Sequence, residues 1–187
     1  MTQAKTALNG VDRAALDATL AAVRQNPHLA AVTFTLGADW QQGCHQRAVT
    51  GEVRQNGEAV ADRTARYTLE SDEPAALLGT DKAASPGEYV LQALAGCYAV
   101  TFAANATVRG IELSALALDL EVDFDLQGFL NLDDDVRPGA QEIRVTVRAE
   151  SPNASREQLE ELTDAVQQRS PIRDTLARPV QVTTVLA

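Results

Sequence analysis

The sequence predicts an α+β protein in which antiparallel sheets pack on one long, buried central helix. Three observations lead to this prediction. Residues 85–109 form the longest apolar stretch and carry the start and stop signals of a helix. Residues 116–126 and 142–149 alternate between apolar and charged side chains, which is the period-two pattern of half-buried strands. Strands are predicted on both sides of the long helix, and this order is typical of α+β folds.

A short helical extension is predicted at the start of the chain. Apolar side chains recur at helical spacing within residues 11–25, and Asn26-Pro27 ends that pattern. We therefore divide the chain into an extension over residues 1–28 and one main domain over residues 29–187. The sequence contains no internal repeat and no low-complexity linker that would argue for a further domain.

Three strands are predicted between the extension and the central helix. Apolar and polar residues alternate over 32–36, as expected for a half-buried strand. Residues 45–55 and 58–69 flank Asn56-Gly57, a dipeptide typical of the tight turn between antiparallel strands. The segment 72–84 has the composition of a loop.

The central helix over residues 85–109 is predicted from its caps and from its composition. Ser85 is a good N-cap, Glu88 completes a capping box with it, and Gly110 is a natural stop. Because the helix is apolar on nearly every side, we expect it to be buried inside the protein. A membrane span is the competing interpretation, and polar residues such as Gln92 argue against it, so no membrane association is expected.

Two strands, a helix and a closing strand are predicted after the central helix. If 116–126 and 142–149 pair antiparallel, the arginines of the second strand lie opposite the carboxylates of the first, which stabilises the sheet. Ser155 and Gln158 form a capping box for a helix that ends at about Gln168. Residues 180–186 have the composition of a closing strand.

Composition and charge exclude several classes of function. The net charge of −10 argues against a nucleic-acid surface, which normally shows a basic patch. Two cysteines and two histidines without ligand spacing predict no metal site, and no phosphate-binding glycine motif predicts a nucleotide cofactor. Residues 1–10 are polar and lack the features of a secretory signal, so we expect a cytoplasmic protein with reduced thiols.

Motifs along residues 30–187 resemble the OsmC/Ohr family of thiol peroxidases, and in particular an OsmC-like subgroup. The resemblance is carried by the order and spacing of several motifs rather than by one of them. These motifs are Ser71-Asp72-Glu73-Pro74, Leu77-Leu78-Gly79-Thr80-Asp81, Ser85-Pro86, Glu88 with Leu91, Leu94 and Ala95-Gly96-Cys97, Arg109-Gly110-Ile111-Glu112-Leu113, Arg169-Ser170-Pro171-Ile172, and Arg178-Pro179-Val180.

The resemblance implies an intertwined homodimer that reduces peroxides in the oxidative stress response. Organic hydroperoxides are the expected substrates because the lining of the helix is apolar, and no cofactor is expected because no cofactor motif occurs. The resemblance implies that Cys97 attacks the peroxide and becomes a sulfenic acid. It also implies that an arginine stabilises the thiolate and that a glutamate orients the arginine. Arg47 and Glu88 match these two positions. The rivals for the arginine are Arg54, Arg63 and Arg66.

The sequence departs from the family pattern at the position of the second, resolving cysteine, which is Ser170. A serine cannot form a disulfide with Cys97. Cys44 is the only internal candidate for a resolving thiol, and otherwise an external thiol must complete the cycle. The candidate binding residues are His45, which shares a strand face with Arg47, together with Gln92, Thr101 and Ser170.

Each candidate residue also has a purely structural interpretation. Cys97 can be a small buried hydrophobe, and Glu88 can serve only as a helix cap. Thr101 lies one turn after Cys97 and can bond its carbonyl, while Ser170 can be the N-cap before Pro171. The alternative function is therefore a noncatalytic relative that binds a small apolar ligand in the dimer pocket.

Overall fold

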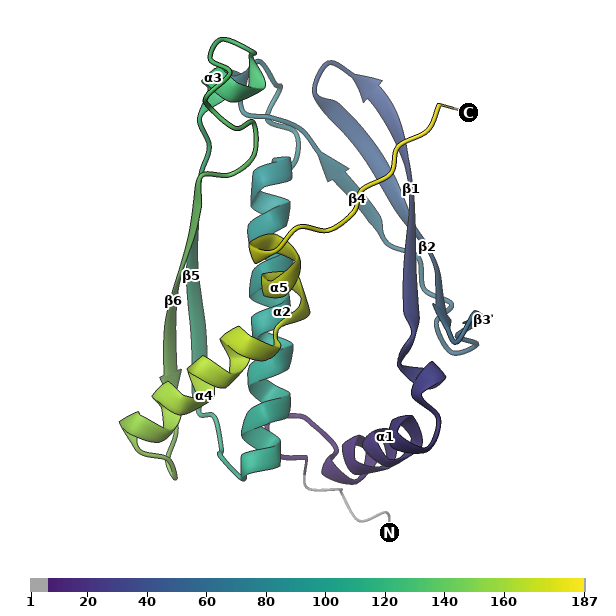
Figure 1. Ribbon diagram of the computed structural model, residues 1–187, viewed down its shortest axis with the longest axis vertical. Coiled ribbons are helices and arrows are strands. Elements are labelled where there is room, and N and C mark those ends of the chain that lie inside the picture. The colour runs from purple at the N-terminus through teal and green to yellow at the C-terminus, as the bar shows by residue number, and fades with distance from the viewer. Residues whose placement is uncertain (1–6, 187) are drawn as a thin grey trace. The chain divides into compact units, whose positions relative to one another are not determined.

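Helices and antiparallel strands alternate along the chain, which confirms the predicted α+β class. The computed structural model describes residues 7–186, and the fold divides into two units (Figure 1). Unit 1 contains the described residues up to Arg13 together with those from Val90 onward. Unit 2 is Ala14–Tyr89.

Unit 1 is built around the long helix α2, beside which two strands and a crossing helix lie in Figure 1. The elements are α2 (Pro86–Arg109, whose first residues belong to unit 2), β5 (Ala115–Asp123), α3 (Leu126–Phe129), β6 (Glu142–Glu150), α4 (Arg156–Arg169) and α5 (Pro171–Ala177). The predicted central helix and the two long strands are therefore present, with bounds that differ by a few residues.

The core of unit 1 is a stripe of side chains along α2 at spacings of four residues. Buried Leu94, Tyr98, Phe102 and Ala106 follow one another on this stripe, because residues four apart share a helix face. Leu162 and Val166 of α4 and Ile111 close the cluster. The apolar faces of β5 and β6 pack against the same cluster.

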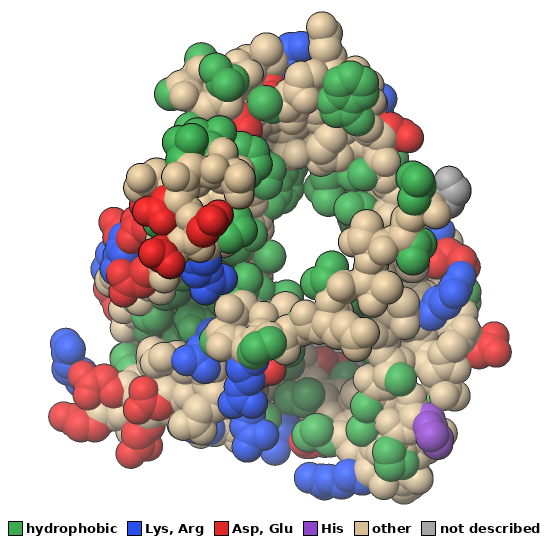
Figure 2. Space-filling view, turned by 45° about the horizontal axis from the view of Figure 1, so that its top comes forward, with side chains coloured by type: hydrophobic (Ala, Val, Ile, Leu, Met, Phe, Trp, Pro, Cys, Tyr) green, Lys and Arg blue, Asp and Glu red, His purple; other side chains and the backbone are tan. Residues whose placement is uncertain are grey.

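Strands β5 and β6 pair antiparallel, as predicted, and their outer face carries interleaved charges. Arg144 lies opposite Glu121 and forms ion pairs with Glu121 and Asp123, while Arg148 pairs with Asp119. Hydrogen bonds from these arginines hold the pKa of Asp119 and of Asp123 below their usual value. Figure 2 shows acidic and basic side chains mixed over this part of unit 1.

The ends of the helices follow the predicted capping signals. The Ser85 amide donates to Glu88 Oε2 at 2.7 Å, and the Glu88 amide donates to Ser85 Oγ at 3.2 Å. Gly110 has a φ of 70°, a conformation that costs glycine little and lets the chain turn away at the end of α2. Ser155 and Gln158 form the predicted capping box at the start of α4.

Asn9 joins the N-terminal segment of unit 1 to the end of α2. Its side-chain amide donates to the Ile111 carbonyl at 2.9 Å, and its side-chain oxygen accepts from the Leu113 amide at 2.8 Å. The Thr107 hydroxyl donates to the Leu8 carbonyl at 2.8 Å. These bonds satisfy backbone groups that a helix end would otherwise leave without partners.

Unit 2 is an antiparallel sheet centred on β2, to which β1, β3 and β4 all pair. Its turn at Asn56-Gly57 is present as predicted, with positive φ at both residues. The elements are α1 (Arg13–Gln25), a 3-10 turn (Pro27–Ala30), β1 (Val32–Gln42), β2 (His45–Gln55), β3 (Glu58–Ala59), β4 (Thr68–Ser71) and a second 3-10 turn (Ala75–Leu77).

Two expectations about strands in unit 2 differ from the structure. Of the predicted strand 58–69, only its first and last residues pair with β2. The intervening residues mix apolar and charged side chains without the alternation that would favour one sheet face. Strand β1 was expected to be half-buried but is exposed along its whole length, and Phe34 is 77% exposed.

Residues 180–186 form no strand within the described part of the chain, although a closing strand is predicted there. A strand forms only where another strand supplies backbone partners, and the described chain pairs none with this segment. Helix α2 is also less buried than expected, since Val100 is 71% exposed. By length and composition α2 could cross a membrane, a criterion that the core helix of a globular protein can also meet.

Asp72 organises the loop that leads from β4 to α2. Its buried carboxylate accepts from the Glu73 amide at 2.9 Å, from the Thr80 hydroxyl at 2.5 Å and from the Lys82 amide at 3.2 Å. The hydrogen bond from Thr80 contributes most to lowering the pKa of Asp72 to about 2. The loop is closed so tightly that a Cβ at Gly79 would collide with the Glu73 backbone.

We expect Asp72→Asn to destabilise unit 2 at neutral pH. A depressed carboxyl pKa stabilises the folded state above the unfolded-state pKa near 4, and this contribution disappears as the pH falls towards 2. The difference between wild type and variant should therefore be present at pH 7 and shrink below pH 4. Thermal unfolding followed by Trp40 fluorescence measures it, with the exposed Asp62→Asn as control. Equal behaviour of the two variants would contradict this account.

Candidate functional site at Cys97

Cys97 lies on α2 with its sulfur at the junction of α4 and α5. The Ser170 hydroxyl donates to Cys97 Sγ at 3.1 Å, and the Ile172 backbone amide donates to the same sulfur at 3.5 Å. Cys97 is only partly buried. A partly buried cysteine whose sulfur accepts two hydrogen bonds differs from an inert cysteine packed among apolar side chains.

Ser170 ends α4 and begins α5, and it is 1% exposed. Its backbone amide donates to the Val166 carbonyl at 2.9 Å, and its side-chain oxygen accepts from the Arg173 amide at 3.3 Å. Because the oxygen is already an acceptor on that side, its own proton is available for Cys97 Sγ. Ser170 is thus the N-cap of α5, in agreement with the structural interpretation, and also a hydrogen-bond donor to the sulfur.

The two polar residues singled out on α2 occupy different positions. The Thr101 hydroxyl donates to the Cys97 carbonyl at 2.7 Å, as the structural interpretation anticipates. This bond is made to the backbone and leaves the sulfur unaffected. Gln92 is exposed on α2.

Tyr98 and Arg173 border the Cys97 site and were not singled out from the sequence. Burial raises the pKa of Tyr98, and the positive charge of Arg173 acts in the opposite direction. Arg173 therefore lies close enough to Tyr98 to influence it electrostatically. No motif marks Arg173, and Tyr98 follows Cys97 in sequence but resembles an ordinary core aromatic.

Unit 2 brings three of its charged or titratable side chains together on one face of the sheet. Glu70 Oε1 lies 3.6 Å from Arg47 Nε, and Glu70 Oε2 lies 3.6 Å from His45 Nε2. His45 and Arg47 share a strand face, and Arg47 is directly opposite Glu70 in the register of β2 and β4. Glu70 was not singled out from the sequence. Its position beside Arg47 depends on the register between β2 and β4, which local sequence patterns do not reveal.

Glu88 and Cys44 have local partners in the structure. The Glu88 carboxylate accepts from the Ser85 amide, which is its capping role. Cys44 is exposed beside the turn between β1 and β2, and its thiol donates to the Leu78 carbonyl at 3.7 Å. Both cysteines are free thiols.

No cluster of three or more His, Cys, Asp or Glu side chains that could hold a metal occurs among residues 7–186. At Cys97 the described residues supply a sulfur that accepts two hydrogen bonds. Such a sulfur can act as a nucleophile when it is ionised.

The fold and the cysteine on the central helix define a protein of the OsmC/Ohr class. The family model described as OsmC-like protein matches residues 79–185, more than half of the chain. This chain belongs to the OsmC-like protein family. None of the curated proteins matches it significantly.

Solved structures share this fold at low sequence identity. An OsmC-like protein from Mycoplasma pneumoniae is 21% identical, with 78% of this chain and 87% of that chain covered and a TM-score of 0.59. A putative osmotic stress induced and detoxification response protein from Psychrobacter arcticus is 12% identical, with 76% and 88% covered and a TM-score of 0.56. An organic hydroperoxide resistance protein OsmC from Legionella pneumophila is 17% identical, with 77% and 88% covered and a TM-score of 0.52.

Proposed function

We propose that this chain is a cysteine-dependent reductase of organic hydroperoxides that acts in the oxidative stress response. The observation that carries the proposal is the sulfur of Cys97, which accepts hydrogen bonds from the Ser170 hydroxyl and the Ile172 amide. Donors aimed at a sulfur favour its negatively charged form. The name of the Legionella pneumophila protein, which shares the fold, supports the choice of substrate class.

In the first step the Cys97 thiolate attacks the outer oxygen of the hydroperoxide. The oxygen–oxygen bond breaks, a sulfur–oxygen bond forms, and the alkoxide leaves with its electron pair and takes up a proton. The products are an alcohol and a sulfenic acid on Cys97, so the peroxide is reduced and the sulfur is oxidised. The Ser170 hydroxyl and the Ile172 amide would hold the sulfur in place during the attack.

In the second step an external thiol reduces the sulfenic acid, because Ser170 cannot form a disulfide and the Cys44 thiol is hydrogen-bonded to the Leu78 carbonyl on the surface of unit 2. The thiol attacks the sulfur of Cys97 and releases water, which leaves a mixed disulfide. A second molecule of thiol displaces Cys97 and regenerates it. Such a cycle needs a compartment rich in reduced thiols, and the proposal therefore includes a cytoplasmic location.

Arg47 remains the predicted activating cation, and Glu88 the residue predicted to orient it. In unit 2 the carboxylate beside Arg47 is that of Glu70, while Glu88 caps α2. The substitution Arg47→Gln removes the proposed activating cation and should slow the first step. Glu88→Gln keeps a capping-box side chain, as Gln158 does at the start of α4, but removes the charge that would orient the arginine. A slower first step in Glu88→Gln would support the orienting role, and an unchanged rate would contradict it.

The test of the proposal is trapping of a sulfenic acid on Cys97. We expect stoichiometric organic hydroperoxide, followed by a 1,3-diketone reagent, to label the Cys97 peptide in wild type. Cys44→Ser should label equally, because Cys44 is a separate exposed thiol. Labelling of Cys44 alone, or of neither cysteine, would contradict a peroxide-reactive Cys97.

A second candidate function is binding of a small ligand without catalysis, which Ser170 at the second-cysteine position favours. The trapping experiment separates the two, because a noncatalytic relative forms no sulfenic acid at stoichiometric peroxide.

We also propose that the chain forms a homodimer, in which a second copy of the chain covers the exposed apolar surfaces. Phe34 and Trp40 on β1, Val100 on α2 and Val182 near the C-terminus are each more than 70% exposed. Large apolar side chains with this degree of exposure are typical of surfaces that contact another chain. Residues 180–186 also offer unpaired backbone groups, which a strand of another chain could satisfy.

We expect Val182→Asp to shift the chain from dimer to monomer, because a charge would then be buried at the interface. Sedimentation velocity at micromolar concentration measures the shift. Thr183→Asp is the matched control, since its side chain points the other way if the segment is extended. A wild-type monomer, or equal effects of the two substitutions, would contradict the proposed interface.

A further inference from the structure

Unit 1 contains an open pocket of about 560 Å³ between α2, β6 and the helices α4 and α5. This volume lies within the range of small-molecule sites. Apolar side chains from three of these elements line the pocket, among them Leu94 of α2, Val145 of β6 and Leu176 of α5. Cys97 does not line this pocket.

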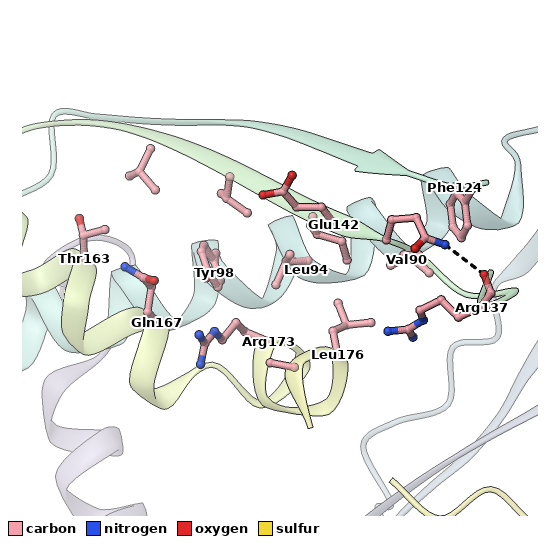
Figure 3. A pocket seen from close by; sticks show the side chains of 16 residues that line it. Val90, Leu94, Tyr98, Phe124, Arg137, Glu142, Thr163, Gln167, Arg173 and Leu176 are labelled. Atoms are coloured by element: carbon pink, nitrogen blue, oxygen red, sulfur yellow. Dashed lines mark hydrogen bonds between the residues drawn. The ribbon is translucent and has the colours of Figure 1, made fainter. Parts of the chain in front are cut away.

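Three polar side chains from three different helices lie at one end of this pocket. They are Tyr98 of α2, Gln167 of α4 and Arg173 of α5, and we call them the polar end (Figure 3). In the same view Arg137, which also lines the pocket, lies at the opposite end, beyond Leu176. The polar end is therefore held together by the packing of α2, α4 and α5.

The Tyr98 hydroxyl at the polar end has no hydrogen-bond partner among residues 7–186, although Tyr98 is only 4% exposed. In the described chain the side-chain polar atoms that are both sealed from solvent and without a partner are His45 Nε2 and Gln46 Oε1. The Tyr98 oxygen is not sealed in this way, and the opening that its side chain lines is this pocket. Burial raises the pKa of Tyr98, so at neutral pH the phenol is a donor that faces the pocket without an acceptor.

The positive charge of Arg173 is not neutralised by any carboxylate that the structure describes. The neighbouring Asp174 is paired with Arg178 at 3.1 Å. Glu142, the one acidic residue of the lining, accepts a hydrogen bond from Arg144 at 2.7 Å. The polar end therefore combines one uncompensated cation with a phenol that lies within its electrostatic reach.

We propose that this pocket binds a monocarboxylate with a hydrocarbon chain, whose head accepts hydrogen bonds from the Tyr98 hydroxyl and the Arg173 guanidinium. Charge-assisted bonds from these two donors suit the two oxygens of a carboxylate. The chain of the ligand would pack on the apolar lining that includes Leu94 and Val145. A single cation matches a monoanion, whereas a doubly charged phosphate head would add negative charge to a chain that already carries −10.

This binding does not require Cys97 to react, so it goes beyond the proposed peroxidase activity. We expect Cys97→Ser to bind the carboxylate as tightly as wild type, because Cys97 does not line the pocket. Loss of binding in this variant would place the ligand at the Cys97 sulfur and would overturn the proposed site.

The experiment is calorimetric titration of the full chain with octanoate. The comparison ligands are octan-1-ol, which lacks the charge, and octyl phosphate, which carries a larger anionic head on the same hydrocarbon chain. We expect octanoate to bind at least about tenfold more tightly than octan-1-ol, because its hydrogen bonds are charge-assisted. The absence of octanoate binding, equal affinity for octan-1-ol, or tighter binding of octyl phosphate would overturn the proposal.

Variants test the two donors of the polar end. Tyr98→Phe and Arg173→Gln should each lower the ratio of octanoate affinity to octan-1-ol affinity, Arg173→Gln by about tenfold or more, because each removes a partner of the carboxylate. This ratio separates loss of the head site from general damage to the pocket, which would weaken both ligands. Arg137→Gln is the matched control, since Arg137 lines the opposite end of the same pocket. An unchanged ratio in Tyr98→Phe or in Arg173→Gln, or an equal fall in Arg137→Gln, would overturn the site as described.

Discussion

Replacing Ser170 by cysteine is expected to produce a chain that closes a disulfide between positions 97 and 170 when it meets peroxide. The Ser170 oxygen already lies 3.1 Å from Cys97 Sγ, so a thiol at this position would face the sulfenic sulfur directly. Its attack would release water and make the resolving step internal, while an external thiol would still be needed to reduce the disulfide formed. The measurements are the number of free thiols after one equivalent of hydroperoxide and mass spectrometry of the linked peptides.

The same substitution should protect Cys97 against over-oxidation. Without a resolving thiol, excess peroxide converts the wild-type sulfenic acid to sulfinic acid, whereas a disulfide stops that reaction. Ser170→Ala is the matched control, because it removes the hydroxyl and supplies no thiol. If Ser170→Cys forms no disulfide with one equivalent of hydroperoxide, and its Cys97 still becomes a sulfinic acid in excess peroxide, the geometry assigned to this pair is wrong.

Phe102→Ala is expected to have the largest effect on stability. Phe102 is fully buried at the centre of the cluster formed by α2 and α4. Truncating such a side chain costs about 3–5 kcal/mol, a large part of the roughly 5–15 kcal/mol by which domains are stable. Urea unfolding followed by far-ultraviolet circular dichroism measures the loss, since α2 and α4 supply most of the helix in unit 1.

Leu132→Ala provides the comparison for Phe102→Ala, because Leu132 is 72% exposed. Its removal should change the free energy of unfolding by no more than about 0.5 kcal/mol. Trp40 is the single tryptophan and lies on β1, so its fluorescence reports on unit 2 in the same experiment. A loss below about 1 kcal/mol for Phe102→Ala would contradict the central place given to this side chain.

The elements that could be predicted from the sequence are those whose signals are local. Helix α2 was recognisable because Ser85, Glu88 and Gly110 mark its ends within a few residues. Strands β5 and β6 were recognisable because each alternates strictly, and their pairing brings Arg144 to Glu121 as expected. In each case the contacts that determine the element's structure lie within the element itself or with the strand that pairs with it.

Burial was harder to predict, because it depends on what lies against an element. The alternation of β1 predicted a half-buried strand, and the strand exists but stays exposed. Residues 180–186 have the composition of a strand but find no pairing partner within the described chain. An alternating pattern predicts that one face of a strand becomes buried. It does not tell whether that face packs against the same chain or against another molecule.

The candidate site was predictable only in part for the same reason. Cys97 and Ser170 were singled out from motifs, yet their hydrogen bond joins residues 73 positions apart. Arg173 stood in no motif, and its place near Tyr98 depends on how α5 folds back on α2. Glu70 beside Arg47 likewise follows from strand register, which local patterns leave open.

The most direct test of the central claim is consumption of an organic hydroperoxide by the full chain with a supplied thiol reductant. We expect wild type to turn over, Cys97→Ser to fall to the background rate, and Cys44→Ser to retain activity. The expectation for Cys97→Ser follows because the serine hydroxyl is not ionised at neutral pH and cannot replace the thiolate. Equal, background-level turnover by wild type and Cys97→Ser would contradict the assignment of Cys97 as the nucleophile.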